Sequence, residues 1–220
     1  MVSSPDLALW MLTTLVEAFV VCLFLARRLF RKFLFFNLYL TLCVVTSMAR
    51  YLILLHFGLR SFEYSHFYFY TDAVLTVSLF LGICELGVRL VGSEMRWRFA
   101  LLSAGALVAA AWVSYSVVSL SPARMGMHFL FELSENIFLA CSLAIVLLWT
   151  WKLRNNPEDR TAARLINVLS VYFLLVLLAY GARQLAPHTR GLQNLLPMSG
   201  AWLPLGCGFA LVSREDSRGM

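Results

Sequence analysis

Charged residues are scarce in this 220-residue chain. Only 14% of the residues are Asp, Glu, Lys or Arg, whereas 60% are hydrophobic, and the mean hydropathy is +0.77. A water-soluble domain carries about 25% charged residues, so this chain has too few to cover a surface in contact with water. The composition therefore predicts an all-α membrane protein that crosses the lipid bilayer several times.

Motifs that would mark a particular chemistry are also missing. The chain has no Gly-rich phosphate loop, no H-E-x-x-H or G-x-S-x-G motif and no C-x-x-C pair. Its five cysteines lie in apolar stretches, without a histidine nearby in sequence: Cys22, Cys43, Cys84, Cys141 and Cys207. The sequence therefore predicts no disulfide framework, no metal site and no cofactor. It identifies no catalytic residue, which makes an enzyme the least favoured class.

Lysine is nearly absent. The two lysines, Lys32 and Lys152, both lie between apolar stretches. A retinal protein needs a lysine at membrane depth for its Schiff base, so this class of seven-helix protein is excluded. The net charge of +6 comes from short basic clusters and not from a contiguous basic surface, so we expect no nucleic-acid partner.

Seven apolar stretches of 20 to 25 residues fill most of the chain, each long enough to cross a hydrocarbon core of ~30 Å. They are Leu7–Ala26, Phe33–Leu55, His66–Leu90, Phe99–Leu120, Met127–Trp151, Arg164–Leu185 and Leu192–Val212. The connecting segments are short. We therefore expect residues 1–220 to form a single domain, a bundle of seven transmembrane helices.

Basic residues are distributed unevenly between the two sides of this bundle. The first, third and fifth connections and the C-terminus hold 13 Lys and Arg residues, whereas the opposite side holds 4. Because cytoplasmic loops carry an excess of Lys and Arg, the N-terminus is predicted outside and the C-terminus in the cytoplasm. We expect a multi-pass protein of the cell (inner) membrane.

Six charged residues lie in the outer half of the predicted bundle, and together they form the predicted binding site. They are Glu17, Arg50, Asp72, Glu132, Glu135 and Arg183. A charge near the bilayer centre costs ~2.5–3.5 kcal/mol, so these side chains should face one another or water inside the bundle. Four acids outnumber two arginines. About two carboxylates therefore remain to hold a proton, water or a cationic ligand.

Several of these charges have predicted partners. Arg50 and Asp72 lie at matching depth on consecutive helices, which predicts an ion pair. Glu132 and Glu135 are three residues apart and share a helix face, and His128 lies one turn before Glu132. Nearer the cytoplasmic side, Glu85 precedes Arg89 by four residues, which predicts a structural pair within one helix.

A weak internal repeat is present. Leu-x-Glu occurs at Leu15–Glu17 and again at Leu133–Glu135. The apolar stretch that follows each of them carries an Asn and, further on, Ala-Arg: Asn37 and Arg50 in one, Asn167 and Arg183 in the other. The spacings differ by three residues, so chance is the alternative explanation. A true repeat would give two parallel three-helix halves joined by the fourth helix.

Three functions are compatible with this pattern. The first is a sensory or accessory module, in which a membrane or cytoplasmic protein partner reads the binding of a ligand in the outer half. The second is a small proton- or cation-coupled transporter. The third is an intramembrane enzyme that modifies lipid. A purely structural subunit of a larger membrane complex is also compatible with the pattern. The expected partners are the lipid bilayer and a membrane or cytoplasmic protein, and a homo-oligomer remains open.

Overall fold

A computed structural model describes residues 4–58, 61–91, 95–119, 125–154, 159–185 and 195–212 of the chain. Within these ranges, the side chains of residues 4–7, 9, 125–126, 180–185, 195–201 and 212 lie outside the description.

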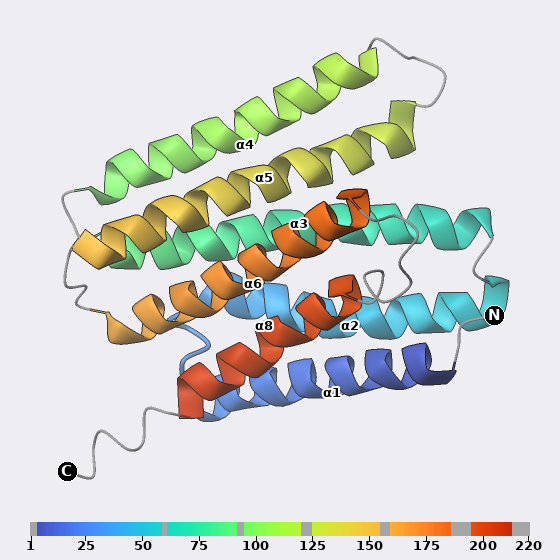
Figure 1. Cartoon of the computed structure of the whole chain (residues 1–220), viewed down its shortest axis with the longest axis horizontal. Coiled ribbons are helices and arrows are strands. Elements are labelled where there is room, and N and C mark those ends of the chain that lie inside the picture. Colours follow the sequence, from blue (N-terminus) through green and yellow to red (C-terminus); the bar gives the residue numbers. More distant parts are fainter. Residues whose placement is uncertain are drawn as a thin grey trace.

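The described residues form seven helices and no strand (Figure 1). The helices are α1 (Ser4–Ala26), α2 (Leu34–Phe57), α3 (Phe62–Leu90), α4 (Arg96–Ser119), α5 (Met125–Arg154), α6 (Arg160–Leu185) and α8 (Leu195–Val212). The predicted all-helical class is therefore confirmed. The ends of the helices differ from those of the apolar stretches by at most four residues.

Five helices of the described part are long and apolar enough to cross a membrane: Leu34–Phe57, Phe62–Leu90, Arg96–Ser119, Met127–Arg154 and Arg160–Ala179. The apolar segments described in the other two helices are shorter, at Trp10–Ala26 and Trp202–Leu211. Large apolar side chains point outward from the bundle, among them Leu102, Trp112 and Phe209, which are 70–76% exposed. Such a surface suits hydrocarbon and not water, so the structure supports a multi-pass membrane protein.

Six of the helices form a ring, and α4 lies outside it (Figure 1). Around the ring, α1 packs on α2, α2 on α3, α3 on α5, α5 on α6, α6 on α8, and α8 on α1. Helix α4 packs on α3 and α5. We call the end of the bundle where α2 finishes and α3 begins the outer end, because the distribution of basic residues predicts it outside, and we call the opposite end the inner end.

The inner half of the ring is closely packed. Fully buried side chains come from all six helices of the ring, and those of α2, α3, α5 and α6 include Phe36, Ile83, Leu86, Leu148, Leu165 and Leu169. Gly82 allows α3 to approach α2, since a Cβ at this position would lie 3.1 Å from the Phe36 Cα atom. Gly206 similarly allows α8 to approach α6, since a Cβ there would lie 2.6 Å from Val168 Cγ1.

Glu85 stabilises the inner end in a way that the sequence did not predict. Its carboxylate accepts hydrogen bonds from the backbone N–H groups of Leu34, Phe35 and Phe36, at 2.8, 2.9 and 3.2 Å. These groups begin α2 and have no acceptor within their own helix. The prediction that Glu85 pairs with Arg89 was wrong, because the start of α2 packs beside Glu85. The guanidinium of Arg89 instead lies 5.3 Å from the centre of the Phe33 ring.

Asp159 joins the first inner connection to the start of α6. Its carboxylate contacts Lys32 Nζ at 2.8 Å and accepts hydrogen bonds from the N–H groups of Thr161 and Ala162, which caps the helix. Burial raises the pKa of Asp159, but the hydrogen bonds from Lys32 and from the backbone outweigh it, so the pKa lies below its usual value of 3.8. The inner end is therefore closed by polar contacts as well as by packing.

Candidate binding site

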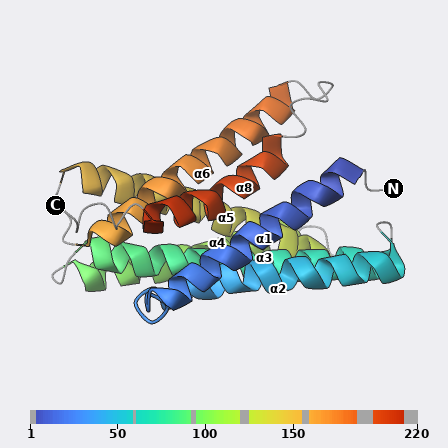
Figure 2. The same cartoon turned by 90° about the horizontal axis from the view of Figure 1, so that it is seen from below.

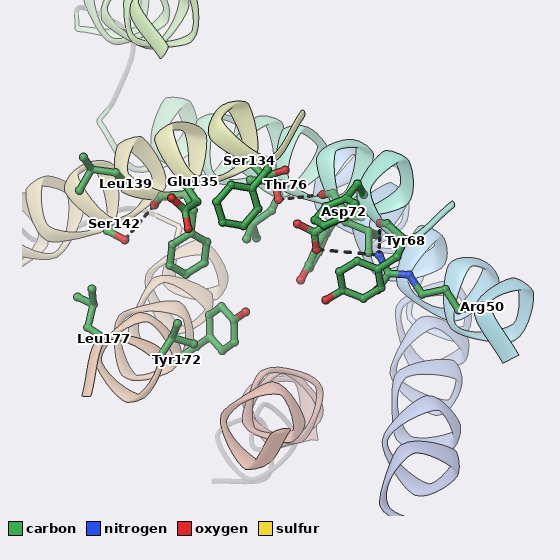
Figure 3. Close-up of a pocket in the computed structure, with 17 residues that line it drawn as sticks. Arg50, Tyr68, Asp72, Thr76, Ser134, Glu135, Leu139, Ser142, Tyr172 and Leu177 are labelled. Atoms are coloured by element: carbon green, nitrogen blue, oxygen red, sulfur yellow. Dashed lines mark hydrogen bonds and ion pairs between the residues drawn. The ribbon is translucent and has the colours of Figure 1, made fainter. Parts of the chain in front are cut away.

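A cavity of about 720 Å³ lies in the outer half and middle of the ring, between α2, α3, α5 and α6 (Figure 3). Helices α6 and α8 incline away from α2 and α3 toward the outer end (Figure 2). Because side chains near the helix crossings fill only the inner half, this inclination leaves room for the cavity at the other end. Sites for small molecules typically have volumes of ~300–1,000 Å³, so this cavity has the size of a ligand site.

The Arg50 side chain enters the cavity from α2, and its Nε and Nη2 groups are engaged there. Nη2 lies 4.0 Å from Asp72 Oδ1 and donates to the backbone carbonyl of Tyr68 at 3.2 Å, while Nε donates to Thr71 Oγ1 at 2.9 Å. The guanidinium carbon also lies 4.2 Å from the centre of the Tyr68 ring, a cation–π contact. The predicted ion pair between Arg50 and Asp72 is thus present, and it lines the cavity.

Glu135 brings a second carboxylate to the cavity, from α5. Figure 3 shows this carboxylate directed into the cavity, on the side of Tyr172. Among the described residues, no side chain or backbone group forms an ion pair or hydrogen bond with it. Of the charged side chains that the structure places along the cavity, Glu135 is therefore the one without a partner of opposite charge.

Aromatic and apolar side chains make up most of the cavity wall. The aromatic ones come from all four helices and are Tyr39, Tyr68, Phe69, Phe131, Phe138 and Tyr172. Leu139 of α5 and Leu177 of α6 also line the cavity, although they are 57% and 51% exposed on the outside of the bundle. The cavity therefore reaches the surface between α5 and α6, where the side chains at its mouth are apolar.

Glu132 and Glu17 lie outside this cavity. Glu132 Oε1 lies 4.0 Å from His128 Nδ1, one turn earlier on α5, and Glu132 does not line the cavity as Glu135 does. Glu17 lies on α1, close enough to Cys43 of α2 for an electrostatic interaction, and it is likewise absent from the cavity wall. The structure thus places these two residues outside the wall of this cavity, and their part in binding stays a prediction.

Arg183, the sixth predicted residue, lies on α6, but its side chain lies outside the described residues. Its backbone position is about 9 Å beyond Leu177 along the helix, at 1.5 Å per residue. The structure thus brings Arg50, Asp72 and Glu135 to one cavity.

Sequence reasoning missed the tyrosines of the site. Tyr68 and Phe69 belong to a run of aromatic residues near the start of α3, for which the sequence predicted no site, and both line the cavity. Tyr39 and Tyr172 received no role at all, although each places a hydroxyl in the middle of an apolar stretch. That position was the available signal, because a phenol group at membrane depth needs a polar environment.

The described residues offer no metal site, since no group of three or more His, Cys, Asp or Glu side chains is placed to hold an ion. Comparison of the chain with protein-family models, with curated proteins and with solved structures finds no match. The geometry of the cavity is therefore the basis for the function proposed next.

Proposed function

We propose that this protein is a sensory or accessory module of the membrane, which binds a small molecule in the cavity between α2, α3, α5 and α6. The observation that carries the proposal is the cavity itself. It combines about 720 Å³ of space and an aromatic wall with an ion pair and a second carboxylate, the combination of apolar lining and few polar groups that is typical of ligand sites.

Two of the helices that line the cavity also form the inner end. Lys152, near the end of α5, donates a hydrogen bond to the side-chain oxygen of Asn167 on α6, and Asp159 caps α6 while it contacts Lys32. A ligand that moved α5 relative to α6 would strain these contacts. Ligand binding would therefore change the inner surface, where a protein partner could read it.

Cross-linking in native membranes tests this proposal. We expect a stoichiometric partner with a soluble output domain, cross-linked through Lys32 or Lys152. We also expect the activity of that partner to differ between the wild-type protein and a Glu135→Gln variant, but not between wild type and Glu63→Gln, which removes an exposed carboxylate at the start of α3. A protein isolated alone or only with copies of itself would contradict the proposal.

A small proton- or cation-coupled transporter is the second candidate, and the ring of helices favours it. If α1, α2 and α3 are matched with α5, α6 and α8, the packing of α1 on α2 corresponds to α5 on α6, α2 on α3 to α6 on α8, and α3 on α5 to α8 on α1. Transporters built from two such halves bind their substrates between them. Uptake into vesicles that depended on Glu17 and Glu135 would favour this candidate over the first.

A further inference from the structure

We propose that the ligand of the cavity is a lipophilic organic cation, which Glu135 binds through its charge. This inference rests on the proposed binding function and adds the chemical class of the ligand. It follows from three observations: how the charges along the cavity are partnered, what surrounds Glu135, and where the cavity opens.

The partners of the charged groups determine the sign of the ligand's charge. Arg50 is held by Asp72, by the Thr71 hydroxyl, and by the backbone and ring of Tyr68. The charge of Arg50 is thus already compensated by Asp72, whereas a cationic ligand would meet Glu135, which has no ion-pair or hydrogen-bond partner among the described residues. Of the described charges that line the cavity, two are negative and one is positive, so the cavity as a whole favours a cation.

The surroundings of Glu135 fit the body of such a ligand. Phe131 and Phe138 lie one turn to either side of it on α5, and Tyr172 lines the same cavity from α6. The faces of aromatic rings attract cations, and the same rings bind apolar groups. The site can therefore neutralise a positive charge and bury the carbon skeleton that carries it.

The mouth of the cavity fits a ligand that enters from the membrane. Leu139 and Leu177, which line the cavity between α5 and α6, are each more than half exposed. In a bilayer, this part of the bundle faces hydrocarbon, so a molecule that partitions into lipid can reach the cavity sideways. A small hydrophilic cation would not follow this route, because it does not enter hydrocarbon.

Binding of tetraphenylphosphonium to the full-length protein in lipid nanodiscs tests the inference, with tetraphenylborate as the anion of the same shape. Empty nanodiscs correct for partition into lipid. We expect saturable binding of the cation and none of the anion. We expect Glu135→Gln to weaken binding of the cation about tenfold, since it removes the charge at nearly constant shape, and Glu135→Asp to retain most of it.

Glu63→Gln is the control, because it removes a carboxylate from the exposed start of α3 and should leave the affinity unchanged. Elution of each variant as a single species shows that it has folded. Absence of saturable cation binding, equal binding of the anion, or an unchanged affinity in Glu135→Gln would each overturn the inference. Saturable cation binding without any captured partner would contradict the signalling role alone, and a captured partner without cation binding would contradict the ligand class alone.

Discussion

At the inner end of the bundle, the Glu85 carboxylate accepts three backbone hydrogen bonds, whereas in the outer half the Glu135 carboxylate accepts none from the described residues. The side chains around the two carboxylates also differ in how closely they pack. Large side chains fill the inner half, with Ile83, Leu86 and Leu165 fully buried, and the outer half contains a cavity of about 720 Å³. Glu85 in the inner half thus stabilises the fold, while Glu135 in the outer half is available to a ligand. Replacements of charged residues in both halves test this division.

Replacement of Glu85 should have the largest effect. Glu85→Ala leaves three N–H groups at the start of α2 without their acceptor, and hydrogen bonds to a charged group contribute about 1.5–3 kcal/mol each when they are buried. Because two of the three are exposed, we expect a loss of about 2–4 kcal/mol in the free energy of unfolding. An SDS titration in mixed micelles measures it. A loss below that of the exposed control Glu63→Gln would show that the cap is dispensable.

Removal of Arg50 should have the next largest effect, because it leaves Asp72 without its cation. We expect Arg50→Ala to lower the free energy of unfolding by about 2 kcal/mol, and Asp72→Asn to restore part of this loss in the double variant. The coupling should be about 1 kcal/mol, since the Asp72 side chain is 41% exposed and the closest atoms are 4.0 Å apart. Additive losses in the double-mutant cycle would show that the two side chains do not interact.

The contact between Lys32 and Asp159 should make a smaller contribution to the free energy of unfolding, and this contribution should depend on pH. The pKa of Asp159 is lower in the folded than in the unfolded chain, so the unfolded chain binds more protons in acid and stability rises with pH. The stabilisation by this contact is present at pH values above 3.8, the usual pKa of an aspartate. It is lost as the pH falls through the lower pKa of Asp159 in the folded chain.

We expect Lys32→Met to lower the free energy of unfolding by less than about 1 kcal/mol at neutral pH, because Lys32 is partly exposed to solvent. The difference between wild type and variant should shrink below pH 3.8. Thermal unfolding between neutral pH and acid measures it. A difference that stayed constant with pH would contradict the assignment of the contact to Asp159.

Glu135→Gln should have the smallest effect on stability. Its carboxylate has no partner among the described residues, so we expect the free energy of unfolding to change by less than about 0.5 kcal/mol, while binding to the cavity weakens. Glu85→Gln should show the opposite combination, a loss of stability with binding retained by the molecules that fold. The same SDS titration measures both variants. Equal losses of stability would remove the distinction between the two halves.

The helices could be predicted from the sequence because transmembrane stretches depend on hydropathy and length alone. The pair of Arg50 and Asp72 could also be predicted, since both residues lie at similar depth on consecutive helices. The role of Glu85 could not, because Arg89 offered a partner within the same helix and the sequence does not reveal that α2 begins beside it. Nor does depth along a helix reveal which helices enclose a cavity or which helix face lines it. Glu17 lies on α1, which contributes no residue to the cavity wall, and Glu132 lies on α5 but does not line the cavity as Glu135 does.

Helix α4 lies outside the ring, yet it determines the direction of half of the ring's helices. Three consecutive helices carry the chain from one end of the bundle to the other. A second group of three helices attached directly to α3 would therefore start at the opposite end from α1, and each would run antiparallel to its counterpart in the first group. Helix α4 crosses the bundle once more, so that α5 begins at the same end as α1 (Figure 1). Helix α4 thus returns the chain to the end of the bundle where α1 begins. A connector that spanned the bundle in the same direction could replace it, whereas deletion of α4 would invert the second half.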